Sequence, residues 1–571
     1  MISVPVLTTA RHGEQRIVER VEQAVRPIVE AIVARAPKGW TRAVLHGRAG
    51  RGGTMVTGGY TRKGRPDNSG VPHPYEDLMA LAEAVREDRG WESVSFEIQC
   101  LPSGAYQLVA FHDALTRVTG TDGGFQVVLD PAYRLPQPGE CQERGTAAPA
   151  GDPELAVARF RTYMERRAAI MGHPEELPPP ATPAAIDEAE RRIGRRLPAD
   201  LRALYAIADG DAVGFESRYL FHDSSWLSLK RLVAEYSEWG AGERPWFTWE
   251  LEWEAVVFDA TPADTVRRCG GHPGWLRFAT SEDGNYLAVD TDPAREGHPG
   301  QIIRTGRDYD DGPHYLGDSI TSLLGRYLEL LDQGAYEQED DYLSLLDPAG
   351  EHAPRQIIGD LTTPVPPTLQ AIHINNVTGL VDLTPLTAAT GLRRLHLNRS
   401  WTADLTPVRD MPVESLRVGL SGTDLTALTD HPHVSSLDLK TTAPVDLTPL
   451  RTAPGLRALD LSEADPEDLT VVADLKNLRY LALTGHQWST LLDAGAVPHT
   501  LAAARLSGAD ASLDDALAWA ARLGLDTGNA VRVGGYERPA TEPRGYGVGA
   551  GPLGPAIPEP GPTTGDAGDE T

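Results

Sequence analysis

The side chains best suited to chemistry are scattered along this sequence and form no recognisable catalytic set. Histidine stands beside aspartate at His112-Asp113 and His222-Asp223, but neither pair has the spacing of metal ligands. The glycine-rich stretch at residues 47–53 lacks the Gly-Lys-Ser/Thr ending of a phosphate-binding loop, which favours a hairpin tip. The sequence therefore predicts a protein that is not an enzyme and that needs no cofactor or metal.

A second kind of pattern suits protein recognition. Residues 235–272 are rich in tryptophan and glutamate, and aromatic anchors inside an acidic rim are typical of an interface for a basic partner. The candidate protein-binding residues in this stretch are Trp246, Trp249, Trp253, Glu250 and Glu252. The alternative is a folded segment that covers a sheet with its aromatic side chains as core.

A leucine repeat in the C-terminal part predicts the elements that would position a further set of polar side chains. Its LxxLxL cores recur every 21 to 23 residues, with central positions at Ile372, Leu395, Leu416, Leu437, Leu459, Leu481 and Ala504. Between the cores lies an Asp-Leu-Thr-Pro-Leu motif, in which we expect threonine to cap a helical turn and proline to fit its first position. The leucines should stack inward along short parallel strands.

This repeat resembles the short leucine-rich repeat of the bacterial internalin type. That family places asparagine three residues after the last core leucine, where this sequence has Ser400, Ser421 and Thr442 as partial substitutes, and alanine, valine or histidine elsewhere. The resemblance implies a strand surface that binds protein. The outward candidates are Arg394, His396, Arg417, Asp438, Asp460 and Tyr480, with simple solvation as the alternative.

The middle of the sequence opens with a helical hairpin at residues 177–211. Thr182 is a suitable N-cap before Pro183, and Gly194 suits the C-cap of the first helix. Strands are predicted at residues 275–279, 286–290 and 300–303, followed by a helix at 319–331. This order resembles the SUKH superfamily. The resemblance implies the fold of yeast cell-wall-assembly regulators and of many bacterial toxin-immunity proteins.

The N-terminal part is predicted to alternate helices and strands. Helices are expected at residues 14–33 and 75–89, a hairpin at 40–60, and strands at 93–98 and 106–111. With Trp91 and the turn at Gly104, this pattern resembles the YezG-like immunity family.

These patterns predict a multidomain α+β protein, with YezG-like and SUKH-like domains, followed by an α/β leucine-rich-repeat solenoid and a disordered C-terminal tail. The predicted boundaries are 1–135 for the YezG-like domain, 136–152 for a linker, 153–333 for the SUKH-like domain, 334–362 for an acidic connector, 363–525 for the repeats with their cap, and 535–571 for the tail.

Composition limits the choice of partner. The 81 acidic residues outnumber the 53 basic ones, for a formal charge of −28, which disfavours nucleic acid and anionic membrane and favours a basic protein. Three distant cysteines indicate no disulfide framework, and no long apolar run is present, so a cytoplasmic location is expected. The two resemblances imply an immunity-type protein that neutralises a polypeptide toxin, such as a nuclease, by occlusion. The alternative is a regulatory or scaffold SUKH/leucine-rich-repeat protein without a toxin partner.

Overall fold

The computed structural model describes most of the 571-residue chain. The described residues are 12–50, 53–118, 123–212, 218–221, 223–239, 256–309, 311–339, 342–347, 355–361, 364–508 and 511–537. They fall into two compact units, Met1–Asp113 with Gly528–Thr571, and Ala114–Thr527. The second unit contains both the SUKH-like region and the repeats.

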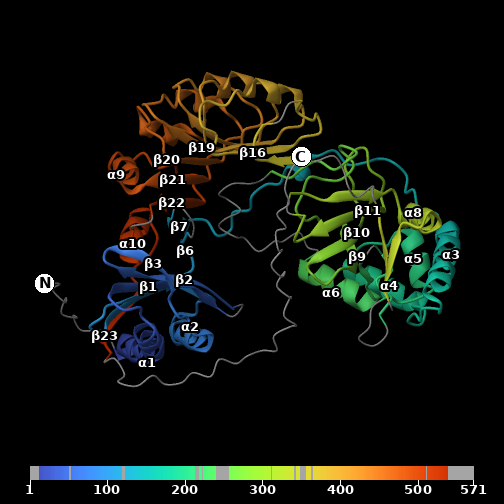
Figure 1. Ribbon diagram of the computed structural model, residues 1–571, viewed down its shortest axis with the longest axis horizontal. Helices are drawn as coiled ribbons and strands as arrows, with labels where there is room; N and C mark the ends of the chain where they lie inside the picture. The colour runs from blue at the N-terminus through green and yellow to red at the C-terminus, as the bar shows by residue number, and fades with distance from the viewer. Residues whose placement is uncertain are drawn as a thin grey trace, which may run out of the picture. The chain divides into compact units, whose positions relative to one another are not determined.

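In the first unit, helices pack on one face of an antiparallel sheet (Figure 1). The helices are α1 (His12–Ala34) and α2 (Tyr75–Arg89). The strands are β1 (Trp40–Gly50), β2 (Gly53–Arg62), β3 (Arg65–Gly70), β4 (Ser93–Cys100), β5 (Ala105–His112) and β23 (Val531–Tyr536), in the order β23-β5-β4-β1-β2-β3. Val25 and Ile28 of α1 are buried with Leu45 and Ile98 of the sheet, as their 3.6- and 2-residue periods require.

The predicted N-terminal elements are present, but the predicted domain boundaries differ from the structure. Residues 115–117 and 124–128, placed in the first domain, form strands of the repeat sheet instead. Val531 and Val533, from the other end of the chain, complete the core of the first unit, and Gly535 belongs to β23 rather than to a tail. Pairing between such distant segments leaves no local signal in the sequence. The YezG-like assignment stays a prediction.

The SUKH-like region surrounds an antiparallel sheet with helices. Its helices are α3 (Pro153–Met171), α4 (Pro183–Ile193), α5 (Ala199–Tyr205), α6 (Leu229–Trp239) and α8 (Ile320–Gln333). Its strands are β8 (Ser225–Trp226), β9 (Trp275–Thr280), β10 (Asn285–Asp290), β11 (Gln301–Gly306) and β12 (His314–Gly317), in the order β12-β11-β10-β9-β8. The rings of Phe160, Tyr205 and Phe221 pack around the buried Trp226, which joins the helices to the sheet.

Local capping explains why the helical hairpin was predictable. The Thr182 hydroxyl accepts a hydrogen bond from the Ala185 N–H at 3.2 Å, as an N-cap does. Gly194 closes α4 with φ of 73°, a left-handed conformation that favours glycine. Both predicted caps of α4 are confirmed.

The predicted acidic connector at 334–362 is partly ordered structure. It contains the hairpin of β13 (Tyr336–Glu339) and β14 (Tyr342–Leu345), and Leu343 and Leu345 are buried in the SUKH-like core. The same stretch also contains β15 (Gln356–Ile358), which starts the repeat sheet. Alternating leucines in β14 are the signal that the acidic composition obscured.

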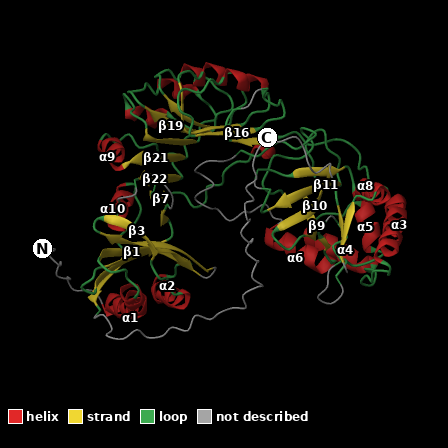
Figure 2. Ribbon diagram, in the orientation of Figure 1, coloured by secondary structure: helices red, strands yellow, loops and turns green. Residues whose placement is uncertain are grey.

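The repeats form a sheet that is parallel from β15 to β22 and ends in an antiparallel pair. Its other strands are β16 (Ala371–Asn375), β17 (Arg394–Thr402), β18 (Ser415–Leu420), β19 (Ser436–Thr441), β20 (Ala458–Glu463), β21 (Tyr480–Thr484), β22 (Ala503–Ser507), β7 (Gly124–Val128) and β6 (Leu115–Arg117). Figure 2 shows short helices on the side of the coils opposite the strands. They are η3 (Thr384–Ala388), η4 (Thr406–Val408), η5 (Thr426–Leu428), η6 (Thr448–Thr452) and η7 (Leu469–Asp474), with α9 (Gly485–Asp493) and α10 (Leu513–Arg522) following.

The predicted phase of the repeat is confirmed by the strand register. Ile372 pairs with Leu395, Leu395 with Leu416, and Leu416 with Leu437, and all four side chains are buried. The same alignment continues through Leu459, Leu481 and Ala504.

The expected capping role of threonine is wrong: threonine is part of the helical turn, and the aspartate of the motif accepts a hydrogen bond from its backbone N–H. Asp382 Oδ1 accepts a hydrogen bond from the Thr384 N–H at 2.9 Å. The same contact recurs at 2.7 to 2.9 Å at Asp404, Asp424, Asp446 and Asp468. Aspartate reaches a backbone N–H two residues on in this Asx-type turn. Hydrogen bonds from the threonine hydroxyl and N–H lower the pKa of each of these carboxyls.

Serine does substitute for the missing asparagine at one turn, as predicted. The Ser400 hydroxyl accepts from the Val377 N–H at 3.0 Å and contacts the Asn398 carbonyl oxygen at 3.1 Å. Backbone groups of neighbouring coils are thereby satisfied by a side chain.

Candidate functional site

The polar side chains between the core leucines form a ladder across the strand face of the repeats. Because side chains alternate along a strand, these residues lie on the face opposite the leucine core. In strand order, this strand-face ladder consists of His373, His396, Arg417, Asp438, Asp460, Ala482 and Arg505. Its first half carries two histidines and Arg417, and its middle carries two aspartates.

The centre of the ladder is held together by ion pairs between neighbouring coils. Arg417 Nε lies 2.8 Å from Asp438 Oδ2, and one terminal nitrogen of Arg417 donates to Asn398 Oδ1 at 3.2 Å. Lys440 of β19 pairs with Glu463 of β20. The Glu463 side chain is 52% exposed and accessible to another molecule, whereas Asp438 and Asp460 are at most 9% exposed.

Two carboxylates stand side by side in the acidic middle. Asp438 and Asp460 are register partners, and Asp460 Oδ1 accepts hydrogen bonds from the N–H and hydroxyl of Ser462 at 2.8 and 2.6 Å. Burial, and then the charge of Asp460, raise the pKa of Asp438 to about 7. Ionisation of both carboxyls is therefore unfavourable, and a nearby cation would stabilise the doubly ionised pair.

The end of the ladder that carries His373 and His396 is covered by the SUKH-like region. Phe258 is almost completely buried, and the guanidinium carbons of Arg394 and Arg355 lie 5.4 and 5.6 Å from its ring centroid. Arg394 also pairs with Asp311 at 3.1 Å. His396 is buried, and its Nε2 lies 2.8 Å from the Ser415 hydroxyl. Burial lowers the pKa of His396 well below its usual value, with the nearby arginines adding to the effect.

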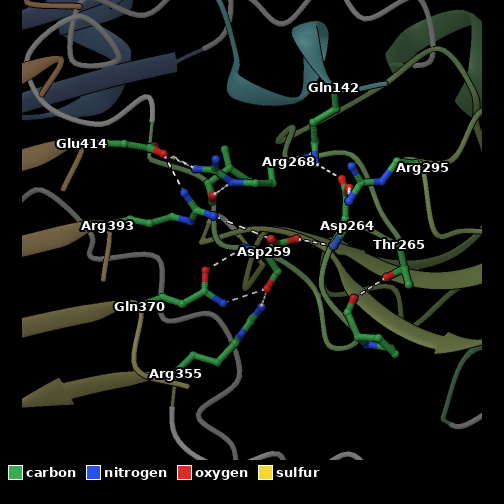
Figure 3. A network of polar contacts seen from close by, with 12 residues as sticks. Gln142, Asp259, Asp264, Thr265, Arg268, Arg295, Arg355, Gln370, Arg393 and Glu414 are labelled. Atoms are coloured by element: carbon green, nitrogen blue, oxygen red, sulfur yellow. Dashed lines mark hydrogen bonds and ion pairs between the residues drawn. The ribbon is translucent and has the colours of Figure 1, made fainter. Parts of the chain in front are cut away.

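A network of polar contacts joins this part of the SUKH-like region to the first coils of the repeats (Figure 3). The Asp259 N–H donates to Gln370 Oε1 at 2.7 Å, and Gln370 Nε2 returns a hydrogen bond to the Asp259 carbonyl at 2.9 Å. One terminal nitrogen of Arg268 contacts both Glu414 oxygens at 2.7 and 2.8 Å, and Arg393 reaches the same carboxylate at 3.0 Å. Such partly buried charged pairs are worth more than exposed ones, provided that both partners remain.

The predicted linker at 136–152 belongs to this junction. It includes η1 (Pro138–Cys141), and Gln142 accepts from the Arg268 N–H at 2.7 Å while donating to Asp264 at 3.0 Å (Figure 3). Arg267 donates to the carbonyls of Gly139 and Gln142. The segment is docked along this stretch because its backbone carbonyls meet buried arginines.

Another part of the same chain covers the far end of the strand face. Tyr133 and Leu135 pack against an apolar cluster that contains Tyr480, whose side chain is buried. A partner can therefore contact Tyr480, Arg394 or His396 only if the chain's own covering segments move. Arg417, Asp438 and Asp460 lie between the two covers, with Arg417 the most exposed of the three.

The other predicted site residues cannot be placed in the same way. Trp246, Trp249, Trp253, Glu250 and Glu252 lie outside the described residues. Phe258, from the same aromatic-rich stretch, is core against the repeats, as the alternative interpretation of that stretch expects.

Sequence reasoning missed Glu414 and its neighbours, although a signal existed. Glu414 stands directly before its strand, as do Arg393, Ser435, Arg457 and Arg479 in the other coils; we call these five residues the edge row. Only the repeat phase reveals that they are equivalent, and only the fold shows what faces them.

The described residues contain no group of three or more His, Cys, Asp or Glu side chains arranged to hold a metal ion. No helix among them has both the length and the apolar character needed to span a bilayer.

Comparison with known proteins assigns the middle region. Residues 180–326 match the SMI1 / KNR4 family (SUKH-1), so the chain contains a domain of that family. The glucan synthesis regulatory protein of Neurospora crassa is 25% identical over 183 residues, which cover 27% of this chain and 34% of that protein. The cell wall biosynthesis/cell cycle regulator smi1 of Schizosaccharomyces pombe is 27% identical over 170 residues, 29% of this chain and 34% of that protein. The chain thus spans about a third of the length of these curated relatives.

Among solved structures, the chain is similar to internalin C2 from Listeria monocytogenes. The likeness has 23% identity and a TM-score of 0.17, and covers 20% of this chain and 52% of the internalin. The fold of the repeats therefore rests on the strand pairing described above rather than on this likeness.

Proposed function

We propose that this chain is a non-catalytic regulatory scaffold whose SUKH-1 domain and leucine-rich-repeat solenoid act together to bind another protein. The observation that carries the proposal is the strand face itself. One end is occupied by Phe258 and the other by Tyr133, which leaves the ion-paired middle around Arg417, Asp438 and Glu463 as the polar surface between two covers. Repeat arrays commonly bind proteins on such faces.

The charge of this surface indicates the kind of partner. Asp438, Asp460 and Glu463 gather on adjacent coils, and the whole chain carries a formal charge of −28. A basic partner would be steered toward this surface, and its association rate would fall as salt screens the charges.

A matched pair of variants tests the proposal. Glu463 on the strand face and Asp474 in η7 are both exposed acids, each paired with one cation of a neighbouring coil. A partner captured from the source cells by the full chain should be lost with Glu463→Lys and kept with Asp474→Lys. Equal capture by both variants would contradict binding at the strand face.

Toxin immunity is the second candidate function, favoured by the same acidic surface. Enzymes that grip nucleic acid carry basic surfaces, which an acidic protein can occlude. Co-expression with a toxin from the gene's neighbourhood would distinguish the two. Rescue of growth that Glu463→Lys abolishes supports immunity, whereas a captured partner that is not toxic supports the regulatory scaffold.

A further inference from the structure

A cavity of about 500 Å³ lies where the segment from Tyr133 to Cys141 runs beside the edge row of the repeats. Pro136, Pro138 and the Tyr133 ring contribute apolar surface from this segment. The coils contribute His433, Arg457 and Arg479, among others. Its volume falls within the range of small-molecule sites in proteins.

Two arginines stand next to each other in this wall. Arg457 and Arg479 occupy equivalent places in consecutive coils, and the Arg479 N–H donates to the Arg457 carbonyl at 2.7 Å. Neighbouring strands are about 4.8 Å apart, so the two guanidinium groups branch from adjacent points of one surface. Like charges at such positions destabilise a sheet unless an opposite charge lies nearby.

The arginines at the two ends of the edge row have different partners. Arg393 is next to Glu414, which also binds Arg268, so the charges at that end are paired within the protein. Arg457 instead contacts the Pro136 carbonyl at 3.4 Å, and Arg479 contacts the Thr500 carbonyl at 2.8 Å and lies 5.7 Å from the centre of the Tyr133 ring. In the described part of the chain, neither Arg457 nor Arg479 has a carboxylate within ion-pair distance.

This basic wall stands out against the rest of the molecule. A chain with 28 excess negative charges places two adjacent arginines and a histidine around one hollow. Glu414, the acid that also lines the hollow, is neutralised by Arg268 and Arg393. Guanidinium groups bind planar oxyanions through paired N–H donors, and an aromatic ring beside them accepts a flat group.

We propose that this cavity binds a small organic anion, in which a carboxylate or phosphate is joined to a ring or a short apolar group. The oxyanion lies between Arg457 and Arg479, and the apolar part packs against Tyr133 and the prolines. This site lies along the edge row rather than at the exposed middle of the strand face, so it does not depend on the proposed protein-binding function.

Four probe molecules distinguish a carboxylate ligand from a phosphate ligand and test whether both the charge and the ring are needed. Hippurate offers a carboxylate with a ring and adenosine monophosphate a phosphate with a ring, whereas adenosine lacks the charge and inorganic phosphate lacks the ring. In calorimetric titrations of the full chain, we expect hippurate or adenosine monophosphate to bind more tightly than either control, and more weakly as salt rises. Binding of hippurate alone identifies a carboxylate ligand, and binding of adenosine monophosphate alone a phosphate ligand. Failure of both at about 10 mM overturns the proposal.

Substitutions in the cavity wall test whether the probes bind in this cavity. Combined Arg457→Gln and Arg479→Gln should weaken binding at least about tenfold, since each guanidinium contributes charged hydrogen bonds. Arg451→Gln, which removes an exposed arginine paired with Asp474 elsewhere in the same coil, should leave affinity unchanged. If the double variant melts below the parent, Arg479→Lys tests the same point, because it keeps the charge but loses the paired donors. Unchanged affinity in a folded Arg479→Lys and in the double variant would also overturn the proposal.

Discussion

The leucine core and the strand-face ladder alternate along the same strands, yet they are specified very differently. Leu395, Leu416 and Leu437 hold equivalent buried positions in successive coils, so every coil repeats one packing solution. Their neighbours His396 and Arg417 differ in charge and in what they contact. The comparison teaches that the core repeats the same apolar packing in every coil, whereas the polar ladder varies from coil to coil and is the part able to serve recognition.

The largest expected effect comes from breaking the core. Leu437→Asp would bury a charge without a partner, which should lower the free energy of unfolding by more than about 3 kcal/mol. Thermal melts of the full chain measure the change, with Glu463→Gln on the exposed strand face as a control that should melt like the parent. An unchanged melt for Leu437→Asp would mean that the side chain is not in the core.

The junction should come next, since it combines apolar burial with charge. Phe258→Ala removes a ring that is buried against Ala371 and lies beside two arginines, at an expected cost of about 3 kcal/mol. Phe258→Leu keeps much of the apolar volume, so the difference between the two variants isolates the ring. Proteolysis near residue 256 should accelerate in Phe258→Ala. A cleavage rate equal to the parent's would show that the cover does not depend on this ring.

The ladder should respond to pH in the direction opposite to ordinary carboxylates. The folded pKa of Asp438 is raised to about 7, whereas its unfolded pKa is near 4. The contribution of Asp438 to stability is therefore fully present below about pH 4 and is lost as pH rises from about 4 through 7. Asp438→Asn should therefore gain about 2.5 kcal/mol relative to the parent between pH 5 and pH 8. Denaturant titrations at both pH values measure this gain. A constant difference between the proteins would contradict the raised pKa.

The exposed aspartates of the repeat motif should give the smallest effect and the opposite sign. The lowered pKa of Asp446 means that its contribution is present above the unfolded pKa, near 4, and is lost as pH falls through the lower folded value. Asp446→Asn keeps an acceptor oxygen for Thr448 but loses the charge, so its melting temperature should fall less than the parent's below pH 4. Asp446→Ala, which loses the acceptor, should be less stable than Asp446→Asn at neutral pH. If the melting temperatures of the parent and of Asp446→Asn fall equally as pH is lowered, this explanation is contradicted.

Elements with local signals were predictable to within a few residues. Thr182 and Gly194 cap α4 because capping needs only neighbouring backbone. The phase of Leu395 and Leu437 was likewise evident, since a repeat displays the same environment many times. The role of the motif aspartate was misread because serine, threonine and aspartate can all cap, and only geometry separates them.

The sequence by itself determined which residues form the repeat core and which residues between them point outward. It also determined that a SUKH-type helical hairpin precedes the repeats. Each of these follows from periodicity and short-range hydrogen bonding. Only the tertiary structure decided that Arg394 lies beside Phe258, that Tyr133 packs against the cluster that contains Tyr480, and that β23 completes a sheet begun at the other end of the chain. These contacts join segments far apart in the chain, and their energy depends on burial and charge pairing that exist only after folding. Exposure on a strand face is therefore a property of the assembled chain, not of the alternating pattern.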